Sequence, residues 1–218
     1  MMTAHRIVCL ALTFTAAATG CSRADENNSS ASPAAHTTHA GAQPEHKTTP
    51  PPQADPADTP VTVSSVRFEV PSAFQQRPTT SSMRVAEFVV HVPDDMTDAE
   101  QGEIVFFYFG PQGAGGVDAN IARWTSQVLT DEGKPADPQR AELELGALKA
   151  TTVRLDGTYM SGPPAGEKTP KKDFTLLGAV VQGGPQGDVF IRMTGPKRVL
   201  DAYPGLFEQL VRSAKVDE

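Results

Sequence analysis

Few side chains in this 218-residue sequence have the types and spacing that catalysis or metal binding requires. The chain has two cysteines and five histidines. His36, His39 and His46 lie close together in sequence, and neutral imidazoles are common metal ligands, so metal binding is the first chemistry to consider. The cysteines are Cys9, inside an N-terminal apolar run, and Cys21, just after that run. That position favours a role in processing rather than catalysis.

The N-terminus has the features of an export signal. Residues 1–6 carry one formal positive charge, and residues 7–18 form an apolar run too short for a bilayer, which needs about 20 residues. Ala18-Thr19-Gly20-Cys21 resembles the lipobox of bacterial lipoproteins, with Ala18 where leucine is more usual. The resemblance implies that Cys21 is acylated, with chains such as palmitate that together hold a protein on a membrane. A plain secretory signal cleaved near Ala18 or Gly20 is the alternative.

Residues 22–60 differ sharply in composition from residues 61–218. They are rich in Ala, Pro, Thr, Ser and His and contain no aromatic residue and no Leu, Ile, Val or Met. Such a segment cannot bury enough apolar surface to offset the entropy of ordering it. We therefore expect a signal peptide over 1–21, a disordered tether over 22–60 and one folded domain over 61–218. The three clustered histidines fall in the tether, where no fold fixes their geometry, so we expect no metal site and no cofactor.

The charge balance argues against nucleic acid as a partner. The chain has 19 Lys and Arg against 26 Asp and Glu, a formal net charge of −7. Removing residues 1–21 takes away Arg6 and no acid, which leaves 18 against 26, or −8. A phosphate-backbone binder is expected to carry a basic stripe, and this sequence has none.

Periodicity within the domain is mostly that of β-strands. Residues 66–70 and 84–92 alternate between apolar and polar positions, as do residues 142–159 around a turn and residues 188–194. Residues 104–109 and 174–181 are apolar at successive positions, which predicts central strands covered on both faces.

Two segments have helical spacing instead. One begins near Gly116 and places Val117, Ile121, Trp124 and Val128 on one face. The other runs from Gly195-Pro196 to about Ala214, and Pro204-Gly205 is expected to kink or split it. The sequence therefore predicts an α+β fold, with a largely antiparallel sheet of about six to seven strands and two main helices packed on it.

Several longer runs support a family resemblance. These are "VPSAFQQRPTTSSMRVAEFVV", "FFYFGPQGAGGVDANIARW", "LDGTYM" and "TGPKRVLDAYPGLFEQLVRSA". They resemble a family of uncharacterised bacterial exported proteins and lipoproteins whose layout is similar to the PsbP-like fold, which is also the fold of a Ran-binding nuclear protein. The resemblance implies a binding or assembly role and supplies no catalytic residues.

Two segments are candidate ligand or partner surfaces. Residues 110–120 form a Gly-rich stretch before a helix, where the backbone N–H groups of Gly113, Gly115 and Gly116 could receive an anion. The alternative is a flexible connection that uses glycine for sharp turns. Residues 157–174 read as a long loop, with Tyr159 and Met160 followed by the basic residues Lys171 and Lys172. A mobile solvated loop is the alternative there.

Catalytic constellations are nearly absent from the sequence. His91 stands alone at a polar-face position of its strand, without a nearby Ser-x-His or Cys partner, so we expect no catalytic residues. We expect a non-catalytic binding or assembly module, anchored by lipid on the periplasmic or cell-surface side of a bacterial membrane. Its partner is then a periplasmic or surface protein. The alternative is an enzyme or small-ligand-binding protein with its site around residues 110–120 and 157–174.

Overall fold

The computed structural model describes residues 58–111, 113–163 and 165–217. The chain divides into two units, residues 1–49 and 50–218, and all described residues belong to the second. The predicted signal peptide, the acylation site Cys21, the three clustered histidines and almost all of the predicted tether lie outside the described residues. The first strand, β1, begins at Thr59, slightly before the predicted start of the domain at 61.

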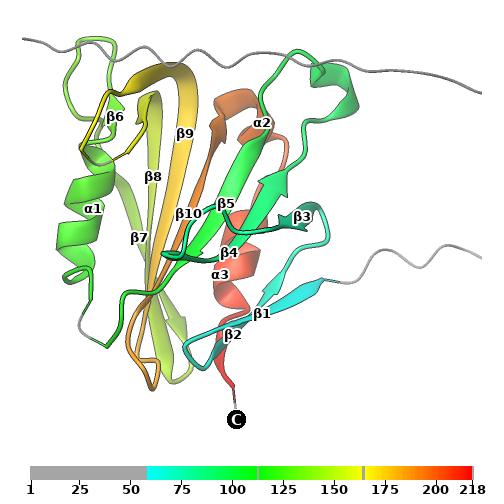
Figure 1. Ribbon diagram of the computed structural model, residues 1–218, viewed down its shortest axis with the longest axis vertical. Coiled ribbons are helices and arrows are strands. Elements are labelled where there is room, and N and C mark those ends of the chain that lie inside the picture. Colours follow the sequence, from blue (N-terminus) through cyan, green and yellow to red (C-terminus); the bar gives the residue numbers. More distant parts are fainter. Residues whose placement is uncertain (1–57, 112, 164, 218) are drawn as a thin grey trace, which may run out of the picture. The chain divides into compact units, whose positions relative to one another are not determined.

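Within the described ranges, eight strands form one sheet in which every pairing is antiparallel (Figure 1). The order is β3-β4-β5-β10-β9-β8-β6, and β7 also pairs with β8. The strands are β3 (Phe74–Arg77), β4 (Arg84–Val90), β5 (Gly102–Phe107), β6 (Val128–Leu129), β7 (Gln139–Leu145), β8 (Leu148–Ser161), β9 (Thr169–Gln182) and β10 (Val189–Pro196).

A smaller sheet of three strands packs against this large sheet. It consists of β1 (Thr59–Val63), β2 (Val66–Val70) and β11 (Lys215–Val216), in the order β1-β2-β11. Apolar and charged residues alternate strictly in β2, so Val66, Phe68 and Val70 face inward. Phe68 meets Phe106 of β5 edge to face, with ring centroids 5.3 Å apart. This contact joins the two sheets in one apolar core.

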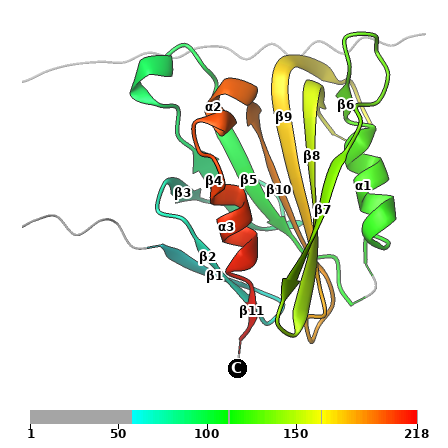
Figure 2. The same cartoon turned by 180° about the vertical axis from the view of Figure 1, so that it is seen from behind.

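The helices of the described residues are short. They are α1 (Val117–Thr125), α2 (Lys197–Asp201) and α3 (Leu206–Arg212), with a 3₁₀ turn at Asp94–Met96. The expected break at Pro204-Gly205 is confirmed, because Gly205 has φ +78° and separates α2 from α3. Figures 1 and 2, seen from opposite sides, place α1 apart from α2 and α3.

The two faces of the large sheet have different covers. Ala179 and Val181 of β9 belong to the core shared with the small sheet, α2 and α3. Leu176 and Val180 of the same strand pack with Trp124 of α1 in a second cluster. Because neighbouring residues of a strand point to opposite faces, we name these the α2/α3 face and the α1 face.

The predicted α+β class is wrong, because the described chain is mostly antiparallel β-sheet with few helical residues. Two causes account for the error. The strands β3, β6 and β11 have two to four residues each, too few to establish a period, and most of β1 lies next to the segment predicted to be a tether. Instead of the two main helices predicted, the described ranges contain three helices of five to nine residues, and Val128, placed on the first helix, lies in β6.

The predicted long loop over 157–174 is also much shorter in the structure. β8 continues to Ser161 and β9 begins at Thr169, so only residues 162–168 connect them. Tyr159 and Lys171 are cross-strand partners, as are Met160 and Pro170. The strands were not recognised in the sequence because this pair of strands carries polar residues on a face that is exposed to solvent.

A close contact fixes α1 on its face and yields the first prediction. A Cβ atom added to Gly178 of β9 would lie 2.5 Å from Trp124 Cζ3, so the indole ring occupies the space that any side chain would need. Gly178→Ala is therefore expected to lower the free energy of unfolding by about 1–3 kcal/mol. Gly116→Ala is the control, because open space surrounds Gly116 and its φ of −70° suits alanine.

Urea unfolding of both variants would measure the effect, and the chain's one tryptophan reports the displacement by fluorescence. We expect a loss below about 1 kcal/mol for Gly116→Ala, at a helix cap position where glycine is only slightly favoured. A Gly178→Ala protein with wild-type stability and unchanged emission would show that α1 is not held in this way.

Candidate functional site

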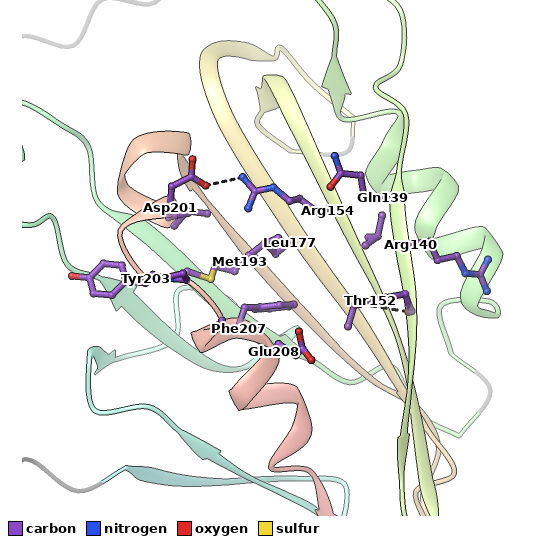
Figure 3. Close-up of a pocket in the computed structure, with 15 residues that line it drawn as sticks. Gln139, Arg140, Thr152, Arg154, Leu177, Met193, Asp201, Tyr203, Phe207 and Glu208 are labelled. Atoms are coloured by element: carbon purple, nitrogen blue, oxygen red, sulfur yellow. Dashed lines mark hydrogen bonds and ion pairs between the residues drawn. The ribbon is translucent and has the colours of Figure 1, made fainter.

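Two concave sites, one on each face of the large sheet, are the strongest candidates among the described residues. On the α2/α3 face, a cavity of about 560 Å³ lies between the strands β7 and β8 and the helices α2 and α3. We call it the helix-side pocket. Figure 3 shows Leu177, Met193 and Phe207 inside it, and Arg154 reaching from β8 toward Asp201 at the end of α2.

The charges in the helix-side pocket are matched within the protein. Arg154 donates to Asp201 at 2.8 Å and also pairs with Asp156 at 3.0 Å, and Lys197 contacts Asp201 as well. Burial works to raise the pKa of Asp201, but the hydrogen bonds and charges of Lys197 and Arg154 hold it below its ordinary value. This pocket therefore offers an apolar floor and an ion pair already formed, which gives a charged ligand little to bind.

The second site lies on the α1 face, on the part of the sheet formed by β4, β5 and β10 and beside the end of the β8–β9 ribbon. It has a volume of about 790 Å³, within the range of small-ligand sites. Four cationic side chains and one carboxylate, Glu103, line it; the cations are Arg84, Arg123, Lys168 and Arg192. We call it the cationic groove, and its local charge contrasts with the acidic chain around it.

A charge network shares Arg84, Glu103 and Arg192 with the lining of this groove and extends beneath it. It consists of Arg77, Arg84, Glu87, Glu103 and Arg192. Its centre is Glu87, which is 0% exposed in a strand between apolar neighbours. Glu87 accepts hydrogen bonds from the Thr80 N–H at 2.6 Å, from the Thr80 hydroxyl at 2.8 Å and from Arg77 Nε at 3.0 Å.

Ionisation of Glu87 is favoured despite its burial. Burial alone works to raise the pKa of this carboxyl, but the Thr80 hydrogen bonds, the charge of Arg84 and the Arg77 hydrogen bond together bring it below its ordinary value. Glu87 is therefore a carboxylate at neutral pH, and it neutralises part of the charge of Arg77 and Arg84.

The other wall of the groove is apolar. Phe107 of β5, Tyr159 and Met160 of β8 and Met83 before β4 all line it. Met83 is 59% exposed, unusually high for a large apolar side chain. Tyr159 stacks on Phe174 of β9, with centroids 6.3 Å apart, and is itself buried, so it presents little more than its edge. The groove thus combines cationic and apolar surface.

The structure separates the residues of the second surface predicted from the sequence. Tyr159 and Met160 line the cationic groove. Lys171 forms an ion pair with Glu100 and lies over the Phe174 ring, 5.3 Å from its centroid, outside the groove lining. Lys172 lines a separate cavity near the start of α2.

The Gly-rich residues before α1 turn their backbone toward a buried side chain. Asn120 Nδ2 donates to the carbonyl oxygens of Ala114, Gly115 and Gly116, each at 3.0 Å. Gly113 and Gly115 occupy tight positions, since a Cβ on Gly113 would overlap the backbone of Phe109 and Gly115 has φ +72°. Convergent carbonyl oxygens favour a donor rather than an anion, so the predicted anion contact gains no support from this geometry.

The charged half of the cationic groove was not predicted from the sequence. Glu87, Glu103 and Arg192 each lie on a strand between apolar residues, with their side chains on the α1 face. A charged residue between apolar residues of a strand is a usable sign of a charged partner, because such residues are rarely buried without one. What the sequence could not provide was the strand order that places β4, β5 and β10 side by side.

The described ranges contain no group of side chains arranged for catalysis around His91 or for metal binding. His91 is exposed, and its backbone carbonyl accepts a hydrogen bond from Tyr203 at 3.0 Å, while no described side chain bonds to its imidazole. No three His, Cys, Asp or Glu side chains in residues 58–111, 113–163 and 165–217 are grouped to hold a metal ion. No helix in these ranges is long and apolar enough to cross a bilayer.

Comparison with known proteins leaves the family open. No family model matches the sequence, and no curated protein matches it. A mutant form of the protein Mog1 is similar in structure, with a TM-score of 0.43 and 12% sequence identity. The match covers 74% of this chain and 96% of that one.

Proposed function

We propose that this chain is a bacterial lipoprotein that acts as a membrane-anchored, non-catalytic binding module, and that the cationic groove is its ligand surface. Cys21 is the proposed anchor, and residues 22–60 are the proposed tether, which lets the domain reach ligands on the periplasmic or cell-surface side. These two elements rest on the sequence alone.

One observation carries the proposal for the groove. Four cations and one carboxylate line a concave surface on a chain with a net charge of −7, and apolar side chains lie beside them. Grouping like charges raises the energy of the folded state, and the buried Glu87 offsets only part of this repulsion, so a ligand of opposite charge would stabilise the arrangement. The helix-side pocket has no such imbalance, since Arg154 and Asp201 neutralise each other there.

Photo-crosslinking in intact cells tests this proposal. A photoreactive amino acid replaces Met83, an exposed residue of the groove lining, in the full membrane-anchored chain. The matched control replaces Lys215 of the small sheet, whose side chain is also exposed. We expect a discrete adduct from position 83, absent from position 215 and lost when Arg192→Glu is added. No adduct at 83, or equal adducts at both positions, would contradict the proposal.

A further inference from the structure

The cations of the groove indicate the class of its ligand, an inference that rests on the proposed function. Three of the four already have close oxygen partners. Arg123 donates to Asn120 Oδ1 at 2.7 Å, and Lys168 donates to the Gly162 carbonyl at 3.1 Å. Arg84 NH1 lies 3.3 Å from a carboxylate oxygen of the charge network. Arg123 and Lys168 are held by residues of their own segments, and Arg84 joins β4 to β5.

Arg192 differs from them. It extends from the central strand β10, its side chain is 16% exposed, and it lines the groove. Its nearest carboxylate oxygen is Glu103 Oε1, 3.8 Å from NH2 and beyond hydrogen-bond length. Glu103 uses its other oxygen for Arg77 at 2.8 Å and Arg84 at 3.3 Å. The buried Arg192 Nε has no hydrogen-bond partner among the described residues.

An under-coordinated guanidinium is costly in a partly buried site. Arginine has five N–H donors in a planar fork, and that fork matches the two oxygens of a carboxylate or phosphate. The Phe107 ring, 5.6 Å from Arg192 Cζ, supplies a cation–π contact but accepts no conventional hydrogen bond. The protein encloses Arg192 Nε, so the donors that an oxyanion would use are those of the terminal nitrogens NH1 and NH2.

The rest of the groove lining indicates the chemistry of the part of the ligand that lies beside the oxyanion. Phe107, Met160 and Met83 offer apolar surface next to the guanidinium, and methionine side chains adapt to flexible apolar groups. An inorganic anion would leave this surface and most of the 790 Å³ unused. A neutral amphiphile would fill the apolar part and leave the Arg192 donors unmatched.

We propose that the cationic groove binds an amphipathic organic oxyanion. The oxyanion head accepts hydrogen bonds from the Arg192 guanidinium, and the apolar chain lies along Phe107, Met160 and Met83. Arg192 thus determines selectivity for charge, while the apolar wall contributes affinity without selecting a particular chain.

Calorimetric titration with decanoate and decan-1-ol separates the head from the chain. The protein is the full chain with Cys21→Ser, so that no acyl group of its own competes. We expect decanoate to bind about tenfold more tightly than the alcohol, because one charged hydrogen-bonded contact contributes at least that factor. Arg192→Met should weaken decanoate binding about tenfold and leave alcohol binding unchanged.

Arg212→Met is the matched control, because Arg212 lies exposed on α3 and pairs only with Glu208 among the described residues. Arg192→Lys keeps the positive charge but not the planar fork, and its affinity for decanoate should be about threefold lower than that of the wild type. This variant tests the role of Arg192 if the methionine variant fails to fold. Equal binding of acid and alcohol, absence of decanoate binding, or indifference to Arg192→Met would overturn the inference. An adduct at position 83 alongside any of these results would leave the proposed function standing.

Discussion

Replacing Phe106 with alanine is expected to lower the free energy of unfolding by about 3–5 kcal/mol. Phe106 is 0% exposed in the central strand β5, and its ring meets Phe68 at 5.3 Å and Phe88 at 6.1 Å, edge to face in both cases. It therefore joins the small sheet to two strands of the large one. Removing the ring leaves a cavity that the strands, held in register by hydrogen bonds, cannot close.

Urea unfolding followed by circular dichroism measures this loss, and Phe109→Ala is the matched control. Phe109 is 40% exposed and stacks on Phe107, so its replacement should cost about 1 kcal/mol or less. The Phe106 variant should still unfold in a single transition, since both sheets share one core. Equal losses for the two variants would mean that the sheets are not coupled through Phe106.

The amount of the fold that the sequence predicts depends on element length. The alternation predicted for residues 66–70 and 84–92 corresponds to β2 and β4, in which Phe68 and Phe88 are buried. The strand β3 has four residues and comes shortly after a proline and a serine, so no period could reveal it. The class was misjudged because two helical patterns proved to be short helices set on a sheet larger than expected.

The candidate site was predicted only in its apolar half. Tyr159 and Met160 stood out as an aromatic and a methionine near glycines, and they do line the cationic groove. Arg192 lies between Ile191 and Met193, so its position inside an apolar strand indicated that it has a partner but not which residue that partner is. Its partners, Glu103 and Phe107, are far away in sequence and come together only through the pairing of β5 with β10.

The buried carboxylate below the groove gives the last prediction, which links stability to pH. Glu87→Gln is expected to cost about 3 kcal/mol, because one member of a buried ion pair is lost and Arg77 and Thr80 keep their donors. The loss should fall at the lower end of the usual range of ~3–5 kcal/mol, since Arg77 and Arg84 are partly exposed and water can solvate them. Glu69→Gln is the control, because its pair with Arg67 at 2.9 Å is half-exposed and should contribute less than about 1 kcal/mol.

The pH dependence of the free energy of unfolding separates the electrostatic contribution of Glu87 from its contribution to packing. The pKa of Glu87 in the folded protein lies below its ordinary value, so the folded state favours the ionised form more than the unfolded state does. Its contribution to stability is present at pH values above the pKa of the unfolded-state carboxyl and is lost as the pH falls through the folded-state pKa. The difference in unfolding free energy between wild type and Glu87→Gln should therefore be largest at neutral pH and shrink on acidification. A difference that stays constant with pH would mean that Glu87 stabilises the sheet by packing alone, and the charge network would then have no electrostatic role.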